Sequence, residues 1–273
     1  KNRTLLDWVI KRVNKSKLID EVIIVTSNLK QDKKIIDIAK KNKVNYFCGS
    51  HTNVLKRFVD ASTKFKCENI IRVCADNIFI SHKFIDEIIN KYKEGNYDYI
   101  CNHLSKNYSN QVDGFGAEIF PFSILKNIIK NTKNSEHLEH VTKYIWDNKK
   151  LFKILSINSK FQLKYPELKF EINSTKDYER IKSIVDQTSI NYNDDPIQIV
   201  KKTLNYEFQN TLENLFYLKR SITGKDTEKT LSYINKSISI EIKKNKSNKK
   251  IFDWRIPKVW DVVDAYISDQ NNK

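Results

Sequence analysis

The chain has 273 residues, 40% of them apolar, and a formal net charge of +16. This length and composition are typical of a globular protein with one or two domains and a sizeable core. No stretch approaches the ~20 uninterrupted apolar residues of a membrane span, and no segment resembles a signal peptide. We therefore expect no membrane association and a cytoplasmic location.

The positive charge comes from lysine, because only seven of the 49 basic residues are Arg and the lysines are scattered. Recognition of nucleic-acid phosphates and base edges relies on arginine, so the composition does not favour a nucleic-acid partner. The positive charge could instead attract anionic small molecules, which is a less specific role. The cysteines form no CxxC pair, which indicates reduced, mostly buried thiols; they are Cys48, Cys67, Cys74 and Cys101.

Apolar spacing predicts alternating helices and strands in the first half of the chain. Residues 4–13 carry a helical stripe, with Thr4 placed to cap it and Asp7 as a near-match to a capping box. The other expected helices are 33–41, 54–65, 84–92 and 124–129, and the expected strands are 22–25, 44–47, 70–73, 97–101 and 117–120. This alternation predicts a layered α/β domain with a mostly parallel, mixed central sheet.

Polar side chains follow two of the predicted strands. The strand at 22–25 leads into Thr26 and Ser27, and the strand at 70–73 leads into Asp76. Ligands of open α/β sheets bind where strands end, so Asp76 is the leading candidate for a functional residue. Its neighbour is Asn77, and both residue types favour turns, so a plain turn is the alternative interpretation.

The sequence changes character after residue 186. Residues 187–210 contain Asn-Asp-Asp-Pro and predict a polar linker with a short helix. Helical stripes at 211–216 and 227–234, an alternating strand at 238–242 and an aromatic-rich run at 251–269 then predict an α+β fragment. This fragment is too short to be a full domain.

Five patterns give residues 1–186 a family resemblance. They are LLDWVIKRVNKSKLIDEVIIVTS at 5–27, GSHTNVLKRF at 49–58, IIRVCAD at 70–76, DGFGAEIF at 113–120 and EHVTKYI at 139–145. In this order they resemble the cytidylyltransferase family of sugar-nucleotide synthetases, in the branch of spore-coat polysaccharide, acylneuraminate and Kdo activation. The resemblance implies a three-layer fold of the nucleotide-diphospho-sugar transferase type.

The resemblance also implies a reaction and a set of site residues. The reaction is transfer of CMP from CTP to a sugar hydroxyl, with release of pyrophosphate and assistance from Mg²⁺, in a homodimer built through residues 113–145. Mg²⁺ prefers oxygen ligands and takes one or two carboxylates beside substrate phosphates. By resemblance, Asp76 would be the catalytic metal ligand, Thr26, Ser27 and Arg57 would bind the nucleotide, and Glu118 and His140 would contact the sugar.

Some of these residues have plainer interpretations. Arg57, on a predicted helix, could form a surface ion pair. His137 and His140 are three residues apart and interleaved with glutamates, which hints at a metal-binding face. The HExxH pattern of zinc proteases is absent, however, and a partly exposed helix start explains both histidines.

The sequence departs from the family pattern in three places. The first strand and the Arg-, Gly- and Ser-rich phosphate loop would precede Lys1, so we expect a sheet without one central strand and a domain inactive on its own. The Gly-Asp-x-Pro of the metal strand is replaced by Ala75-Asp76-Asn77-Ile78. A second acidic residue of the family corresponds to the neutral Asn173, whereas Asp177 is retained and should cap the following helix.

Residues 211–273 have a resemblance of their own. The runs at 212–231 and 251–269 resemble the N-terminal part of aminopeptidase-like proteins related to zinc exopeptidases. That family's zinc ligands would follow Lys273, and no His occurs after His140. Two hypotheses result: a CTP-using sugar-activating enzyme, or a degenerate nucleotide-binding or scaffolding module attached to an aminopeptidase-like protein. The changes around Asp76 and the neutral Asn173 favour the second.

Overall fold

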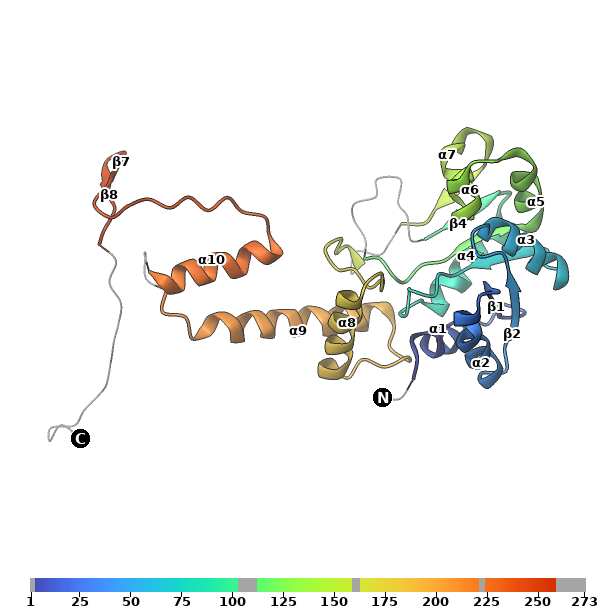
Figure 1. The fold of residues 1–273 in the computed structure, drawn as a ribbon, viewed down its shortest axis with the longest axis horizontal. Helices are drawn as coiled ribbons and strands as arrows, with labels where there is room; N and C mark the ends of the chain where they lie inside the picture. Colours follow the sequence, from blue (N-terminus) through green and yellow to red (C-terminus); the bar gives the residue numbers. More distant parts are fainter. Residues whose placement is uncertain (1–2, 103–111, 159–162, 221–223, 259–273) are drawn as a thin grey trace. The chain divides into compact units, whose positions relative to one another are not determined.

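The computed structural model describes residues 3–102, 112–158, 163–220 and 224–258 (Figure 1). The chain divides into two compact units, residues 1–203 and 204–273. The division falls inside helix α9 (Pro196–Phe216). Across the described ranges, no helix has the length and apolar character needed to cross a lipid bilayer.

Helix α1 (Leu5–Val13) begins at the predicted cap. The Thr4 hydroxyl accepts a hydrogen bond from the backbone N–H of Asp7 at 3.1 Å, and the Asp7 carboxylate accepts one from the N–H of Thr4 at 3.0 Å. Each side chain thus satisfies a backbone donor that the first turn leaves free, which is the reciprocal capping box. The apolar stripe of the helix is buried, as predicted, through Val9, Ile10 and Val13.

The predicted alternation of strands and helices is confirmed, with bounds shifted by one or two residues at most ends. The strands are β1 (Ile23–Ser27), β2 (Asn45–Gly49), β3 (Asn69–Arg72), β4 (Tyr99–Cys101), β5 (Glu118–Pro121) and β6 (Ile154–Ser156). The helices after α1 are α2 (Lys33–Lys41), α3 (Val54–Lys64), α4 (His82–Glu94), α5 (Phe122–Asn131), α6 (Ser135–Glu139), α7 (Lys143–Asp147) and α8 (Thr175–Thr188). Single 3₁₀ turns occur at Lys30–Asp32 and Lys149–Leu151.

The sheet is mixed, but parallel pairs do not dominate it. Strands β1 and β2 pair in parallel, and β3–β5–β4–β6 form a separate four-stranded sheet. Strand β5 runs antiparallel to both β3 and β4, whereas β4 and β6 are parallel. Within the described residues no ladder joins the two sheets. The single, mostly parallel sheet predicted from the sequence is therefore divided, and its centre is antiparallel because β5 inserts between β3 and β4.

Helices cover both faces of the four-stranded sheet, which gives the predicted three layers. On one face, Ile70, Tyr99 and Phe120 pack against apolar side chains of α3, α5 and α7. On the other face, Ile100 and Ile119 pack against α1 and α4. Adjacent residues of one strand, such as Ile119 and Phe120, thus face opposite layers, as the alternation of side chains along a strand requires.

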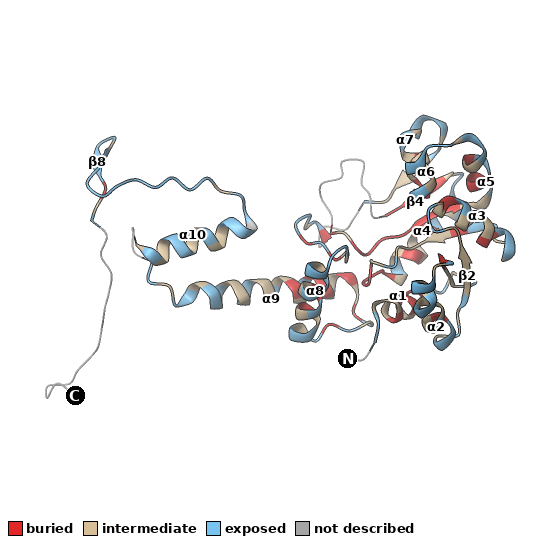
Figure 2. Ribbon diagram, in the orientation of Figure 1, coloured by how far each residue is buried: buried red, intermediate tan, exposed pale blue. Residues whose placement is uncertain are grey.

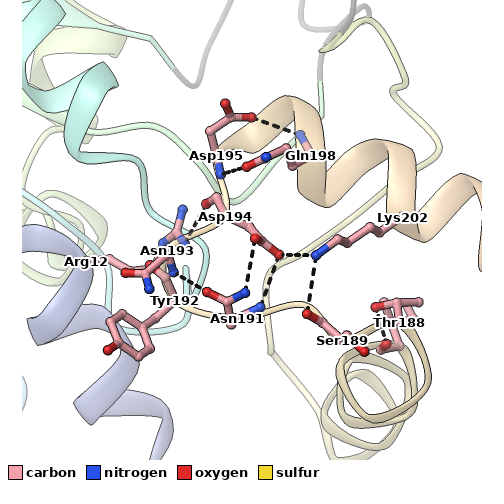
Figure 3. A network of polar contacts seen from close by, with 11 residues as sticks. Arg12, Thr188, Ser189, Asn191, Tyr192, Asn193, Asp194, Asp195, Gln198 and Lys202 are labelled. Carbon is pink, nitrogen blue, oxygen red and sulfur yellow. Dashed lines mark hydrogen bonds and ion pairs between the residues drawn. The ribbon is translucent and has the colours of Figure 1, made fainter.

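Residues 187–195, the first part of the polar linker predicted at 187–210, form hydrogen bonds with α1 and α9 (Figure 3). Arg12 of α1 is 2% exposed and its Nη1 donates to the carbonyls of Tyr192 at 3.1 Å and Asp194 at 3.0 Å. The Asp194 carboxylate accepts hydrogen bonds from Lys202 Nζ at 2.7 Å and Asn191 Nδ2 at 3.2 Å. The short helix expected here is instead the 21-residue α9, which Pro196 can open because the first helical position needs no N–H donor.

The second unit, from Leu204 onward, lacks a core of its own within the described residues. It contains α10 (Lys225–Ser237) and a short hairpin of β7 (Lys250–Ile251) and β8 (Trp254–Arg255). The strand predicted at 238–242 does not form, and Ile238 is 63% exposed. Ile256 is its one buried apolar side chain among those described (Figure 2). Exposed apolar residues spaced by four lie along α9: Phe208, Leu212 and Phe216.

Candidate functional site

Asp76 lies in a turn four residues beyond the end of β3, not at the strand end itself. The turn is closed by the N–H of Asn77 donating to the carbonyl of Cys74 at 3.2 Å. The Oδ1 atom of Asp76 is buried and has no hydrogen-bond partner in the part of the chain that the structure describes. The backbone N–H groups of Asp76 and Asn77 do act on this carboxylate, as in a plain turn, so only the buried Oδ1 is left unexplained by the turn.

Two carboxylates that the sequence reasoning did not single out lie close to Asp76. They are Asp113 and Glu171. Burial raises the pKa of Asp76, and the charge of Asp113 raises it further against the opposing effect of Arg72. Burial also raises the pKa of Glu171, together with the charge of Asp113, a hydrogen bond to Asp113 and the charge of Asp76. Each carboxylate is therefore in the field of the others.

An aromatic cluster holds together the three segments that carry these carboxylates. It consists of Phe79, Phe115 and Phe170, which are 2% exposed or less. The ring centroid of Phe170 lies 5.3 Å from that of Phe79 and 5.3 Å from that of Phe115. Because Phe79 follows Asp76 by three residues, Phe115 follows Asp113 by two and Phe170 precedes Glu171, packing of the rings places the carboxylates on neighbouring segments.

Backbone contacts reinforce this arrangement. Asp113 forms an isolated parallel bridge with Lys169. The N–H of Ile172 donates to the carbonyl of Asp76 at 3.3 Å. The segment 169–172 thus runs beside both of the other segments, with Glu171 between its two points of attachment.

Gly114 allows the close approach of the segments, and its replacement tests the packing. Its φ is +97°, and an added Cβ would lie 2.8 Å from Cβ of Phe170 and 3.1 Å from that residue's carbonyl carbon. We expect Gly114→Ala to lower the free energy of unfolding by about 1–3 kcal/mol, the usual range for such strain, in urea unfolding followed by fluorescence.

Gly95→Ala is the matched control for this prediction. Gly95 has an ordinary extended backbone with φ of −135°, and an added Cβ would meet the ring of Tyr97, which must shift. Its loss of stability should be smaller than that of Gly114→Ala, because no left-handed backbone is strained. Equal stability of the two variants would contradict the tight packing described for Gly114.

The predicted nucleotide-binding residues Thr26 and Ser27 lie at the end of β1 and are buried, with 6% and 2% exposure. Both hydroxyls donate to the carboxylate of Asp32, the Thr26 Oγ1 at 3.4 Å. The Ser27 hydroxyl also accepts from the N–H of Leu29 at 3.1 Å. These bonds shape the loop between β1 and α2, so both residues have structural partners at the place where the nucleotide was expected.

Arg57 lies near the same strand ends, and among the described residues it forms no surface ion pair, which was its plainer interpretation. Its Nη1 donates to the carbonyl of Ser50 at 3.2 Å, while its Nε is buried and has no hydrogen-bond partner among the described residues. Burial lowers the pKa of Arg57, and the charge of Asp32 opposes this shift. The aliphatic part of the Arg57 side chain lies close to Gly49. A Cβ added at Gly49 would lie only 2.9 Å from the Cγ of Arg57.

Of the two predicted sugar-side residues, Glu118 is on β5 and accepts a hydrogen bond at 3.4 Å from the hydroxyl of Thr142, which follows His140 by two residues. Glu118 is 3% exposed and pairs across the sheet with Arg72 of β3, its Oε1 lying 3.2 Å from Nη1. Burial alone would lower the pKa of Arg72, but the charge of Glu118 and its hydrogen bond raise it. His140 is exposed and ends α6, and its contact with a sugar stays a prediction.

His137 has a structural role that the sequence suggested only in outline. Its Nδ1 lies 2.9 Å from the hydroxyl of Thr132 and its Nε2 lies 2.9 Å from the carboxylate of Asp147. The ring therefore fastens α6 to α7. Asp177 likewise supports α8 as predicted, although the N-cap itself is Ser174, whose hydroxyl donates to Asp177 at 2.7 Å.

The surroundings of Asp76 fit a hard divalent cation such as Mg²⁺. A buried carboxylate oxygen without a protein partner and further carboxylates nearby are the oxygen donors that this ion prefers. In the ranges that the structure describes, no group of three or more His, Cys, Asp or Glu side chains is placed to hold a metal ion. An ion held here would thus complete its coordination with water or substrate oxygens, as Mg²⁺ commonly does.

Comparison with known families agrees with this fold and with the first of the two resemblances. Residues 1–223 match the family model described as Cytidylyltransferase, and the chain therefore belongs to the cytidylyltransferase family. Residues 209–268 match a second family, described as Domain of unknown function (DUF4910). The two matches overlap slightly along α9 and the residues that follow it.

Relatives share sequence with this chain, and a solved structure shares its fold. An uncharacterized protein of Methanocaldococcus jannaschii is 32% identical over 177 residues, which are 65% of this chain and 70% of the relative. The spore coat polysaccharide biosynthesis protein SpsF of Bacillus subtilis is 27% identical over 187 residues, 66% of this chain and 75% of that protein. A cytidylyltransferase from Leptospira borgpetersenii superposes with a TM-score of 0.67 at 23% identity, covering 77% of this chain and 85% of the other.

Another relative matches a shorter part of the chain. A putative polysaccharide biosynthesis protein with aminopeptidase-like domain from Clostridium acetobutylicum is 43% identical over 67 residues. These residues are 24% of this chain and only 15% of the relative. A junction between a cytidylyltransferase domain and an aminopeptidase-like segment, as predicted from the sequence, is consistent with this match.

Proposed function

We propose that the first unit transfers CMP from CTP to a hydroxyl group of a surface-polysaccharide sugar and releases pyrophosphate. In this reaction the sugar oxygen bonds to the α-phosphorus of CTP, the bond from that phosphorus to the β-phosphate bridging oxygen breaks, and the hydroxyl proton passes to water. Such chemistry depends on positioning and on neutralising phosphate charge. Membership of the cytidylyltransferase family supports the choice of CTP, and the buried, unpaired oxygen of Asp76 is the observation that carries the assignment of the site.

The chain's own residues have distinct parts in this proposal. Asp76 would hold Mg²⁺, which when bound neutralises the charge of the triphosphate and of the departing pyrophosphate. Arg57, whose Nε is buried without a described partner, would donate to the nucleotide. The loop that Thr26 and Ser27 brace through Asp32 would form the wall of the nucleotide pocket next to Arg57.

The sugar is proposed from the relatives and not from the site geometry. Two relatives are described as polysaccharide biosynthesis proteins, so an acidic sugar of a surface polysaccharide is the proposed acceptor. CTP and Mg²⁺ are cytoplasmic, and the proposed reaction belongs in that compartment. A homodimer through residues 113–145 stays a prediction, which light scattering of the purified protein tests.

The alternative is a degenerate nucleotide-binding or scaffolding module attached to an aminopeptidase-like protein. Asn173, exposed and neutral where the family pattern has an acid, favours this alternative. Under both hypotheses, the enzyme and the scaffolding module, the second unit is part of an aminopeptidase-like segment. We propose that other parts of that domain cover its exposed apolar side chains, because a segment with one buried apolar residue among those described does not form a core.

The proposed reaction is tested by release of pyrophosphate from CTP in the full-length protein, with Mg²⁺ and a panel of acidic sugars. We expect release that requires both the metal and one of the sugars, with CMP-sugar formed in equal amount. A protein that binds CTP but releases no pyrophosphate with any sugar of the panel would contradict the proposed reaction and leave only a nucleotide-binding role.

A further inference from the structure

We infer that Arg72 binds an anionic oxygen group of the substrates, and that Glu118 and Thr142 position it for this contact. The inference rests on the proposed function, because it adds a cationic side chain to the proposed contacts with CTP and the sugar. The group that Arg72 binds is a phosphate of CTP or the carboxylate of the acidic sugar. Both present paired oxygens, which a guanidinium recognises with parallel N–H donors.

Arg72 lies between two of the residues that the sequence predicted for the site. It is the last residue of β3, and the turn that contains Asp76 follows this strand. Across the sheet it pairs in register with Glu118, the first residue of β5. The charge of Arg72 lowers the pKa of Asp76, against the larger effect of burial. Arg72 is thus in contact with a predicted sugar-side residue and in the field of the predicted metal ligand.

The protein uses only part of the guanidinium. Nη1 of Arg72 donates to Oε1 of Glu118 at 3.2 Å, which is the one hydrogen bond of this side chain to the residues that the structure describes. A guanidinium has five N–H donors, so most of the fork has no described partner. The side chain of Arg72 is 22% exposed and that of Glu118 only 5%. The acidic partner is therefore closed off, while the cationic partner stays accessible to a ligand.

Glu118 and Thr142 hold the guanidinium in place. Oε1 of Glu118 also accepts a hydrogen bond from the hydroxyl of Thr142 at 3.4 Å, and both residues are buried. The charge of Glu118 and its hydrogen bond raise the pKa of Arg72, so the guanidinium stays charged. A charged fork that is already oriented needs little reorganisation when it binds an anion. Glu118 and Thr142 are therefore positioning residues, and Arg72 makes the contact with the substrate.

The charges around Arg72 make this contact depend on the metal. The carboxylates of Glu118 and Asp76 both act on the one guanidinium, so its surroundings carry an excess of negative charge. A divalent cation at Asp76 offsets this excess, because a bound ion is the largest local charge in such a site. We therefore expect Arg72 to strengthen binding of an anionic group when Mg²⁺ is present and to contribute little without it.

The test uses Arg72→Lys in the full-length protein. Lysine keeps a positive charge opposite Glu118 but offers a point charge in place of a planar fork. Release of pyrophosphate is measured with Mg²⁺, CTP and each acidic sugar of the panel, and then with the same sugar as its uncharged amide. Calorimetric titration with CTP, once with Mg²⁺ and once with EDTA, measures nucleotide binding apart from the reaction.

The two sources of the anionic group give different results. If Arg72 binds the sugar carboxylate, Arg72→Lys should raise the KM for the acidic sugar by about tenfold or more, the effect of one lost hydrogen bond between charged groups. The KM for the amide and the affinity for CTP should then be unchanged. If Arg72 binds a phosphate, the variant should lower the affinity for CTP with Mg²⁺, or kcat with both forms of the sugar, by a similar factor. Either pattern supports the inference.

Two further variants separate a contact with the substrate from a role in the fold. Thr142→Val removes the hydroxyl that holds Glu118 and should change the same quantity as Arg72→Lys, by a smaller factor of about three. Arg220→Lys, at an exposed position of the second unit, is the control and should match the original protein. Urea unfolding followed by fluorescence should give Arg72→Lys and the original protein similar free energies of unfolding.

Two results would overturn the inference while the proposed function stands. Unchanged KM, kcat and CTP affinity in Arg72→Lys would show that Arg72 only neutralises Glu118. A loss of CTP affinity that is equal with Mg²⁺ and with EDTA, together with lower stability, would show a defect of the fold. If the original protein releases no pyrophosphate with any sugar of the panel, the proposed function fails and the inference fails with it.

Discussion

Asp76→Asn should abolish most of the pyrophosphate release from CTP while leaving the protein folded. The substitution keeps the size of the side chain but removes the negative charge that would hold Mg²⁺. A metal ion that stabilises transition-state charge contributes several kcal/mol, and each 1.4 kcal/mol corresponds to a factor of ten. We therefore expect kcat to fall by roughly a hundredfold to a thousandfold, measured at saturating CTP and Mg²⁺ in the full-length protein.

Stability measurements separate this loss from a folding defect. Burial and the charge of Asp113 raise the pKa of Asp76, which means that the folded protein holds this charge at a cost. Asp76→Asn should therefore be as stable as the original protein or slightly more so in the absence of metal. Asp37→Asn, an exposed position on α2, is the control and should keep full activity. Full activity of Asp76→Asn would remove the basis of the proposed site.

Arg12→Leu should cause the largest loss of stability among the substitutions considered. Arg12 donates to the carbonyls of Ile80, Tyr192 and Asp194 at 2.7, 3.1 and 3.0 Å. Burial lowers its pKa to about 10, with the charges of Asp194 and Asp195 opposing the shift, so the guanidinium stays charged at neutral pH. Its removal leaves several carbonyls without a donor, and each buried unsatisfied group costs about 1–3 kcal/mol.

We expect Arg12→Leu to lower the free energy of unfolding of the first unit by about 3 kcal/mol or more, in urea unfolding followed by fluorescence. Arg12→Lys should be intermediate, because one ammonium group cannot reproduce the fork of a guanidinium. Arg220→Leu, at an exposed position of the second unit, should change stability little. A loss below 1 kcal/mol for Arg12→Leu would show that water replaces the guanidinium and that residues 189–195 are not fixed through it.

The layered fold could be predicted from local patterns because its signals are local. The capping box of Thr4 and Asp7 and the apolar stripe of α1 involve residues only three or four apart. Strand order is not local: β5 pairs with both β3 and β4, and nothing in residues 117–120 states that this strand runs antiparallel. The contacts of the segment before α9 are not local either, because the backbone carbonyls of Tyr192 and Asp194 accept hydrogen bonds from Arg12, about 180 residues earlier in the chain.

The candidate site was predictable only in part, because local sequence patterns reveal some of its residues and not the contacts between them. Asp76 stands out because it follows an apolar strand, and the resemblance gave it a role. Glu171 and Asp113 approach it only through packing of Phe79, Phe115 and Phe170, which no local pattern reveals. Asp32, the partner of Thr26 and Ser27, lies in the loop after β1, and no pattern in the sequence singled it out.

Binding of CTP with and without Mg²⁺ tests the central claim most directly, because it separates a nucleotidyltransferase site from a scaffolding module. Calorimetric titration of the full-length protein should show one CTP bound per first unit, with an affinity that falls by at least about tenfold when EDTA removes the metal or when Asp76 is replaced by Asn. ATP should bind more weakly under the same conditions. Absence of CTP binding, or binding that is indifferent to both Mg²⁺ and Asp76, would contradict the account.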